Sequence, residues 1–253
     1  MNDFKHWHKK ALRCYKDGRY KDAISHFDEA LKYEPDNIEI LIKYSHCLAK
    51  TERYDDAIRC CNRILEKNFG NENALMCKGN IYLEMGNFEK SLSCYDAVLK
   101  LNEDNDMVWY NKGLLFCDFQ RLHEALDCFD RALEIDPLNA MFWKEKGVCY
   151  GEMNQNEKAL ECFEKSLEID GSYIDAAYNK GFALMVLGRR EEAKSVLKDA
   201  GKRSKNVPEL REMIEDVLSD IESDESDSNT ISGKRNVFYV DFRRKKTPRP
   251  PFP

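Results

Sequence analysis

Cysteine is the residue type that most readily suggests chemistry here, because ten cysteines occur among 253 residues. Four of them, Cys60, Cys94, Cys128 and Cys162, recur every 34 residues and could form a ladder of metal ligands. However, the sequence contains no Cys-x-x-Cys pair, the usual sign of a zinc site. Cysteines one helix pair apart are also separated by about 10 Å, too far to share one ion. We therefore interpret the four as small buried hydrophobic residues, and we expect no disulfides in a reducing compartment.

The remaining chemically versatile residues form no catalytic pattern. The five histidines (His6, His8, His26, His46 and His123) make no recurring pair with Asp or Glu at the spacing of metal ligands. A glycine-rich phosphate loop, a Gly-x-Ser-x-Gly elbow and a His-Glu-x-x-His motif are all missing from the sequence. Carboxylates are plentiful but stand one helical turn from Lys or Arg, as on solvated helix surfaces. The sequence therefore predicts no enzyme, no cofactor and no metal.

Composition and charge point to a water-soluble protein. The chain is 42% hydrophobic and 34% charged, with a net charge of −6. This acidic balance argues against general nucleic-acid binding, which needs a basic face to displace counterions. The first ten residues lack the apolar core of a signal peptide, and no apolar run reaches the roughly 18 residues that span a bilayer. We expect a cytoplasmic protein with no membrane partner.

An internal repeat of 34 residues governs most of the chain. Each repeat has a large residue, a small residue four later and a large residue three after that, which places all three on one face of a helix. A second helix then carries a small, a large and a small residue at steps of four and three. The small position of the first helix holds Ala11, Ser45, Gly79, Gly113, Gly147 and Gly181. The large position of the second helix holds Phe27, Cys61, Tyr95, Phe129, Phe163 and Leu197. The pattern predicts a series of helix hairpins, with turns at glycines such as Gly18, Gly86 and Gly188.

This order of residues resembles the tetratricopeptide repeat, most closely in Trp109–Gly113 and Glu124–Pro137. The resemblance covers residues 4–207 as six repeats: 4–37, 38–71, 72–105, 106–139, 140–173 and 174–207. It implies an all-α, right-handed solenoid in which the first helix of each hairpin lines a concave peptide-binding groove. Ala177 and Lys205 depart from the pattern in the sixth repeat, and Cys61 and Phe69 in the second.

Two further segments follow the repeats. Residues 208–222 have an apolar stripe and an acidic face, and we expect them to form a helix that caps the last repeat. Residues 223–253 are predicted to be a disordered tail that is first acidic, then basic and Pro-rich. Nine acidic residues and one basic residue lie in 208–230, whereas seven basic residues and one acidic residue lie in 231–253.

The resemblance also allows three rows of groove residues to be assigned on the first helices. The first row is His8, Ile42, Met76, Tyr110, Lys144 and Tyr178. The second is Leu12, His46, Asn80, Leu114, Val148 and Phe182. The third is Lys16, Lys50, Glu84, Asp118, Glu152 and Val186, which changes from basic to acidic along the chain. Met107 and Asn111 are also assigned to the groove. An apolar floor with a charged edge suits an extended or helical peptide with apolar anchors that is basic opposite repeats three to five. The alternative interpretation is that these residues pack between helices and that the sign change is only a solvated face.

Some tetratricopeptide repeat proteins bind the C-terminal carboxylate of a chaperone through Lys, Asn and Arg at fixed positions. Asn80 and Asn111 stand in suitable places, but the neighbouring positions hold Met76, Met107 or Met141 and Glu145. We therefore expect a different partner. The sequence predicts a scaffold or adaptor whose groove binds a peptide or helix of another protein. Three alternatives remain for the tail: it docks into the groove of its own or another copy of the chain, it is a docking motif for a second protein, or its basic cluster (residues 243–246) contacts nucleic acid or acts as a nuclear-import signal.

Overall fold

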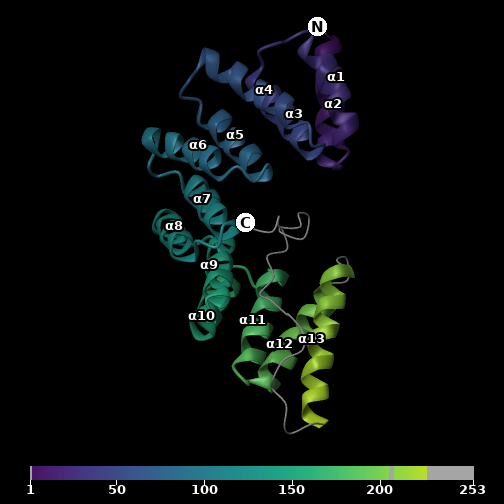
Figure 1. Cartoon of the computed structure of the whole chain (residues 1–253). Helices are drawn as coiled ribbons and strands as arrows, with labels where there is room; N and C mark the ends of the chain where they lie inside the picture. Colours follow the sequence, from purple (N-terminus) through teal and green to yellow (C-terminus); the bar gives the residue numbers. More distant parts are fainter. Residues whose placement is uncertain (1, 205–207, 227–253) are drawn as a thin grey trace. The chain divides into compact units, whose positions relative to one another are not determined.

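In the computed structural model, residues 2–204 and 208–226 are described, and every regular element in them is an α-helix (Figure 1). The helices form two compact units that divide between Phe119 and Gln120. The first unit contains α1 (Asn2–Lys16), α2 (Tyr20–Leu31), α3 (Ile38–Lys50), α4 (Tyr54–Lys67), α5 (Glu72–Glu84), α6 (Phe88–Leu101) and α7 (Asp106–Asp118). The second contains α8 (Leu122–Ile135), α9 (Ala140–Glu152), α10 (Asn156–Ile169), α11 (Ile174–Val186), α12 (Arg190–Arg203) and α13 (Pro208–Ser226). The division falls inside the fourth predicted repeat.

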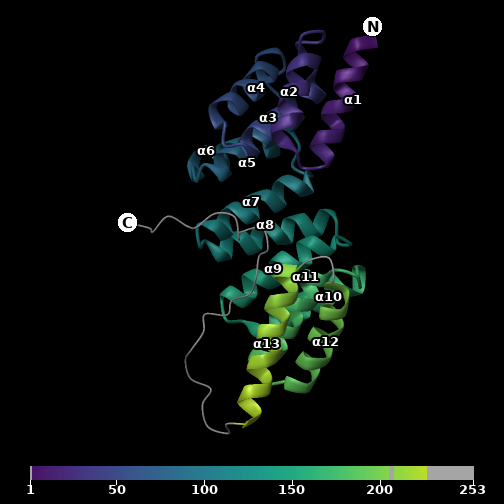
Figure 2. The ribbon, with the colours of Figure 1, turned by 90° about the vertical axis from the view of Figure 1, so that its right-hand side faces the viewer.

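Within each unit, consecutive helices pack as hairpins and neighbouring hairpins pack on each other. In the first unit α1 pairs with α2, α3 with α4 and α5 with α6 (Figures 1 and 2). In the second unit α9 pairs with α10 and α11 with α12, while α13 lies along α12. The predicted all-α architecture of stacked helix hairpins is therefore confirmed.

Asparagine caps begin four of the first helices and recur with the repeat. The side chains of Asn37, Asn71, Asn105 and Asn139 each accept a hydrogen bond from a backbone N–H in the first turn of α3, α5, α7 and α9. The oxygen-to-nitrogen distances lie between 2.9 and 3.2 Å. Each cap satisfies a backbone donor that has no partner within the helix, which fixes where the first helix starts.

A left-handed residue connects the two helices of a hairpin. Gly18, Gly86 and Gly188 adopt φ angles of 70°, 70° and 76°, as the glycines in the sequence predict. The equivalent turns of the other predicted repeats use Glu52, Gln120 and Asn154, with φ between 58° and 63°. The turn geometry is therefore kept even where the sequence supplies no glycine.

The small position of the first helix brings the two helices of a hairpin into close contact. A Cβ atom added to Gly79 would lie 2.7 Å from Tyr95, and one added to Gly147 would lie 2.6 Å from Phe163. Both aromatic rings are fully buried. The glycines are thus required by packing, since no real Cβ atom approaches a neighbour so closely.

A polar contact joins each hairpin to the preceding one and also recurs with the repeat. A side chain on the first helix, Tyr in α3 and Lys in α5, α7, α9 and α11, donates to an oxygen on the second helix of the preceding hairpin. We call these contacts the inter-repeat clasps. They are Tyr44–Asp28, Lys78–Asn62, Lys112–Asp96, Lys146–Asp130 and Lys180–Glu164, at 2.5, 2.7, 2.6, 2.5 and 3.0 Å. In two of them the lysine also makes a cation–π contact with a tryptophan of its own helix. The ammonium groups of Lys112 and Lys146 lie 5.2 and 5.3 Å from the ring centres of Trp109 and Trp143.

Buried apolar residues flank each clasp. Four residues before it and three after it in α5, for example, stand Ala74 and Ile81, both buried. The pairs at these two positions in α3, α5, α7, α9 and α11 are Ile40 and Cys47, Ala74 and Ile81, Val108 and Leu115, Phe142 and Cys149, and Ala176 and Ala183, all buried. Because positions four before and three after a residue share its helix face, these buried apolar residues lie beside the clasp.

The two end helices modify this pattern in opposite ways. In α13 the same stripe holds Leu210, Ile214 and Val217, all buried, so α13 packs on α12 as a first helix would. In α1 the corresponding stripe holds His6, Lys10 and Arg13, all exposed. The outer face of α1 is therefore polar where the interior helices are apolar.

The face of α13 that would receive a second helix is also polar. Arg211 and Glu215 are exposed there and form an ion pair at 2.8 Å. The helix continues to Ser226, four residues beyond the predicted end, so the prediction of a disordered tail from residue 223 is wrong for 223–226. No proline or glycine interrupts those residues, and a polar composition does not by itself end a helix. The rest of the predicted tail, 227–253, lies outside the described residues, as do residues 205–207 of the sixth predicted repeat.

Within the described part of the chain, no helix combines the length and the apolar character that a membrane span requires.

Candidate peptide-binding face

The predicted groove residues of the first unit, with the exception of Tyr110, remain at least partly accessible on its first helices. Lys16, Lys50, Asn80 and Glu84 are at least partly exposed, and Met107 is 38% exposed. The half-buried residues of the same set are His8, Leu12, Ile42, His46, Met76, Asn111, Leu114 and Asp118. We call the members that α3, α5 and α7 contribute, together with Leu12 of α1, the first-helix face.

Hydrogen bonds hold two polar side chains of the first-helix face in place. The Tyr15 hydroxyl lies 2.9 Å from Nδ1 of His46, and the rings of Tyr15 and Tyr20 both pack edge-on against the imidazole. Tyr95 donates from its hydroxyl to Oδ1 of Asn80 at 2.6 Å. With its oxygen engaged in this way, Asn80 presents its NH₂ group as a donor.

Charge on the first-helix face is largely balanced. The third row was predicted to change from basic to acidic between Lys50 and Glu84. These two side chains form an ion pair of 2.5 Å that links α3 to α5. Burial lowers the pKa of His46 below its ordinary value, Lys50 acts in the same direction, and Glu84 opposes them. The imidazole is therefore neutral near pH 7, and the face offers apolar and neutral polar groups to a ligand.

The predicted rows largely fail in the second unit, where four of their six members are buried. Tyr178 is 1% exposed, and Val148 and Phe182 belong to the same hydrophobic cluster. This cluster includes the apolar stripe of α13, so the prediction that these side chains line an open groove is wrong. Burial, followed by the charge of Asp216 on α13, raises the pKa of Tyr178 to about 12.

Lys144 and Tyr110 are corrections of the same kind. Lys144 is 2% exposed, forms an ion pair with the equally buried Glu145, and lies 6.0 Å from the centre of the Tyr173 ring. The pairing of two buried charges offsets the cost of removing each from water. Tyr110, on α7 of the first unit, is 3% exposed. Of the third row in the second unit, Glu152 is half-buried and Val186 is exposed.

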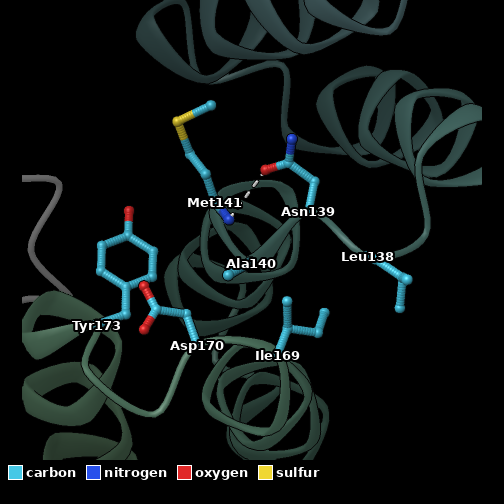
Figure 3. Close-up of a pocket in the computed structure, with 7 residues that line it drawn as sticks. All are labelled: Leu138, Asn139, Ala140, Met141, Ile169, Asp170 and Tyr173. Carbon is cyan, nitrogen blue, oxygen red and sulfur yellow. Dashed lines mark hydrogen bonds between the residues drawn. The ribbon is translucent and has the colours of Figure 1, made fainter.

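A hollow that the sequence did not indicate lies at the loops preceding α9 and α11 (Figure 3). It has a volume of about 500 Å³ and is lined by Leu138, Asn139, Ala140, Met141, Ile169, Asp170 and Tyr173. Leu138 is 75% exposed.

The cysteines and histidines form no metal site in the described part of the chain. No group of three or more His, Cys, Asp or Glu side chains is arranged there to hold an ion. Cys94, Cys128 and Cys162 are buried and Cys60 is partly buried, in agreement with their interpretation as hydrophobic residues. Burial raises the pKa of Cys60 to about 11 and that of Cys162 to about 12.

Comparison with protein families gives three consecutive matches. Models described as tetratricopeptide repeat match residues 15–81, 78–140 and 140–173. Together they span more than half of the chain. No curated protein matches the sequence.

Solved structures share the fold at low sequence identity. The crystal structure of TTC0263, a thermophilic TPR protein of Thermus thermophilus, is 19% identical over 72% of this chain and 99% of its own, with a TM-score of 0.63. The crystal structure of MamA is 23% identical over 64% of this chain and 95% of its own, with a TM-score of 0.57. YrrB, described as a TPR protein with an unusual peptide-binding site, is 20% identical over 75% of this chain and 97% of its own, with a TM-score of 0.54.

Proposed function

Because the chain belongs to the tetratricopeptide repeat family, we propose that it is a protein-interaction scaffold which binds a peptide or helix of a partner on the first-helix face of the first unit. The family generally serves as a non-enzymatic interaction module, which supports a scaffold over an enzyme. The boundaries of the six repeats given by the sequence form part of this proposal.

The observation that carries the proposal is the contrast in burial between the two units. The predicted rows are accessible on α3, α5 and much of α7, whereas Val148, Tyr178 and Phe182 are packed into a core. Accessible apolar residues flanked by fixed polar groups are typical of protein-binding surfaces. The first-helix face is therefore a better candidate than the corresponding positions of the second unit.

The chemistry of the first-helix face defines the ligand. Ile42, Met76, Met107 and Leu114 offer apolar area, and methionine adapts to ligand side chains of different shape. Asn80 supplies an oriented amide donor for a backbone carbonyl. Since Lys50 and Glu84 neutralise each other, the ligand needs apolar anchors and few charges in this region.

A displayed library of random peptides tests the proposal. Peptides selected on the full chain are expected to bind the wild type and to lose binding to Met107→Glu/Asn111→Ala, which places a charge among the apolar residues. Lys100→Glu, at an exposed position of α6, adds negative charge away from the face and should bind as the wild type does. Equal thermal unfolding of the three proteins confirms that each is folded. Peptides that bind both variants equally well would place recognition elsewhere on the chain.

Residues 231–253 lie outside the described residues, so docking of the tail onto its own chain and its contact with nucleic acid both remain predictions from the sequence.

A further inference from the structure

The outer face of α1 contains one half of an inter-repeat clasp. Lys10 occupies the position of Lys78, Lys112, Lys146 and Lys180 in the repeat. Its ammonium lies 5.0 Å from the centre of the Trp7 ring, as Lys112 and Lys146 lie over Trp109 and Trp143. In the interior clasps such a side chain meets an oxygen of the preceding hairpin. Lys10 forms no ion pair with a carboxylate among the described residues.

The residues around Lys10 exclude an ordinary further hairpin as its partner. Interior hairpins meet through buried apolar residues on either side of the clasp, but α1 presents His6 and Arg13 there. Burying these groups against an apolar helix would cost free energy. The face therefore suits a polar, acidic helix. Five basic residues and one acidic residue in α1 favour such a partner.

The opposite end of the same chain supplies a helix of that kind. Glu209, Glu212 and Asp216 of α13 are exposed and lie on one side of the helix, at steps of three and four residues. His6, Lys10 and Arg13 lie on one side of α1 at steps of four and three. Both sets span about 10 Å at the helical rise per residue. When the two helices run antiparallel, the spacings coincide, and His6 faces Asp216, Lys10 faces Glu212 and Arg13 faces Glu209.

We propose that the outer face of α1 binds α13 of a second copy of this chain, so that the protein associates head to tail through these charged rows. Each copy has one α1 and one α13, and the contact is heterologous. The partner carboxylate completes the clasp of Lys10. Because the charges are exposed in the free protein, the association is weak and sensitive to salt.

Sedimentation of the full chain over a range of concentrations tests this proposal. At about 50 mM salt the mean mass of the wild type is expected to rise with concentration, and at about 500 mM salt this rise is expected to disappear, because screening shortens the range of the charges. Lys10→Glu/Arg13→Glu and Glu209→Lys/Glu212→Lys should each remain monomeric at both salt concentrations. Each variant loses two of the proposed ion pairs, and each exposed pair contributes roughly threefold or more to the association constant. The association constant of each variant is therefore expected to fall at least about tenfold.

Mixing the two variants separates pairing from loss of folding. In the first variant both α1 and α13 present acidic residues, and in the second variant both present basic residues. In the mixture, α1 of either variant therefore meets an α13 of opposite charge on the other variant. The mixture is expected to associate as the wild type does. Lys100→Glu/Lys202→Glu, which changes net charge equally at two exposed sites elsewhere, should also behave as the wild type.

The proposal would be overturned by a wild type that stays monomeric at low salt, by variants that associate undiminished, or by a mixture that does not associate. A variant of the full chain with residues 243–246 replaced by alanine should associate normally. If it does not, the basic tail and not α1 is the partner of α13.

Discussion

Replacing Gly147 with alanine isolates the packing requirement at the centre of a hairpin. The added Cβ atom would lie 2.6, 2.9 and 3.0 Å from three carbons of the Phe163 ring. Ordinary contacts begin near 3.4 Å, so at least 0.8 Å (3.4 − 2.6) must be recovered by movement of the ring or the helix. Phe163 is fully buried, so any movement of its ring must displace neighbouring core atoms.

Two opposing terms set the size of the effect. Overpacking of a dense core costs about 1–3 kcal/mol, whereas replacing glycine by alanine within a helix favours folding by about 1 kcal/mol. The net expectation is a loss of about 1 kcal/mol, the difference between the middle of the first range and the second value. Gly201→Ala is the matched control, because its Cβ atom would lie an acceptable 3.5 Å from Ile214. This second substitution keeps the helix-propensity gain without the clash, and should stabilise the protein by up to about 1 kcal/mol.

Urea unfolding of the full chain, followed by circular dichroism, measures both changes. The two substitutions should differ by about 1–3 kcal/mol, the overpacking term alone. Adding Phe163→Leu to Gly147→Ala should recover part of the loss, since the smaller side chain makes room. If Gly147→Ala stabilised the chain as much as Gly201→Ala does, the close approach of α9 and α10 would not be a packing constraint.

Three further predictions concern an inter-repeat clasp, a histidine of the first-helix face and two buried cysteines. Lys112→Met removes an inter-repeat clasp whose lysine is 16% and whose aspartate is 42% exposed. The substitution should lower the free energy of unfolding by less than about 1 kcal/mol, and this loss should shrink when urea unfolding is repeated in high salt. A loss of stability that does not depend on salt would argue against an ionic contact. Because the folded state lowers the pKa of His46, it favours the neutral imidazole, so the stability contribution is present above about pH 6.5 and is lost as the pH falls through the lowered pKa. The protein with His46→Gln should therefore lose less stability than the wild type between about pH 7.5 and 5.5, a window that brackets the ordinary histidine pKa. An equal loss in both proteins would refute the assignment. Burial raises the pKa of Cys47 and of Cys162 to about 12. Both thiols should therefore react with a thiol-specific reagent slowly in the native protein and rapidly in denaturant, as mapped by mass spectrometry. Fast labelling of either cysteine in the native state would show that its thiol is accessible.

The repeat in the sequence predicted the fold well because helix hairpins are determined by local spacing. A large, a small and a large residue on one helical face, as in Trp143, Gly147 and Tyr150, specify both the helix and the close approach of its partner. The intra-hairpin turns were found where glycine marked them. In the other hairpins a turn was expected, but the left-handed residues Glu52, Gln120 and Asn154 were not identified, because a left-handed residue other than glycine has no strong sequence signal.

The candidate binding face was only partly predictable. The rows gave the direction in which each side chain points from its helix, but not which other element lies in front of it. Tyr178 and Phe182 therefore seemed equivalent to Ile42 and His46, although the cluster that buries them includes residues of α13, more than 25 positions further along the chain. The inter-repeat clasps did have a signal, since lysines and carboxylates recur every 34 residues. Only the structure showed that side chains 16 positions apart meet.

The inter-repeat clasps, together with the asparagine caps, limit how the length of this chain can change during evolution. Each clasp joins positions 16 residues apart, and each cap stands at a fixed distance from it. Inserting or deleting a single residue between Asn62 and Lys78 would displace the cap, the clasp and the apolar residues beside it at the same time. Duplication or loss of 34 residues instead preserves every one of these contacts. A gene for such an array therefore lengthens or shortens by recombination between whole modules, while the loops within a module keep the same number of residues.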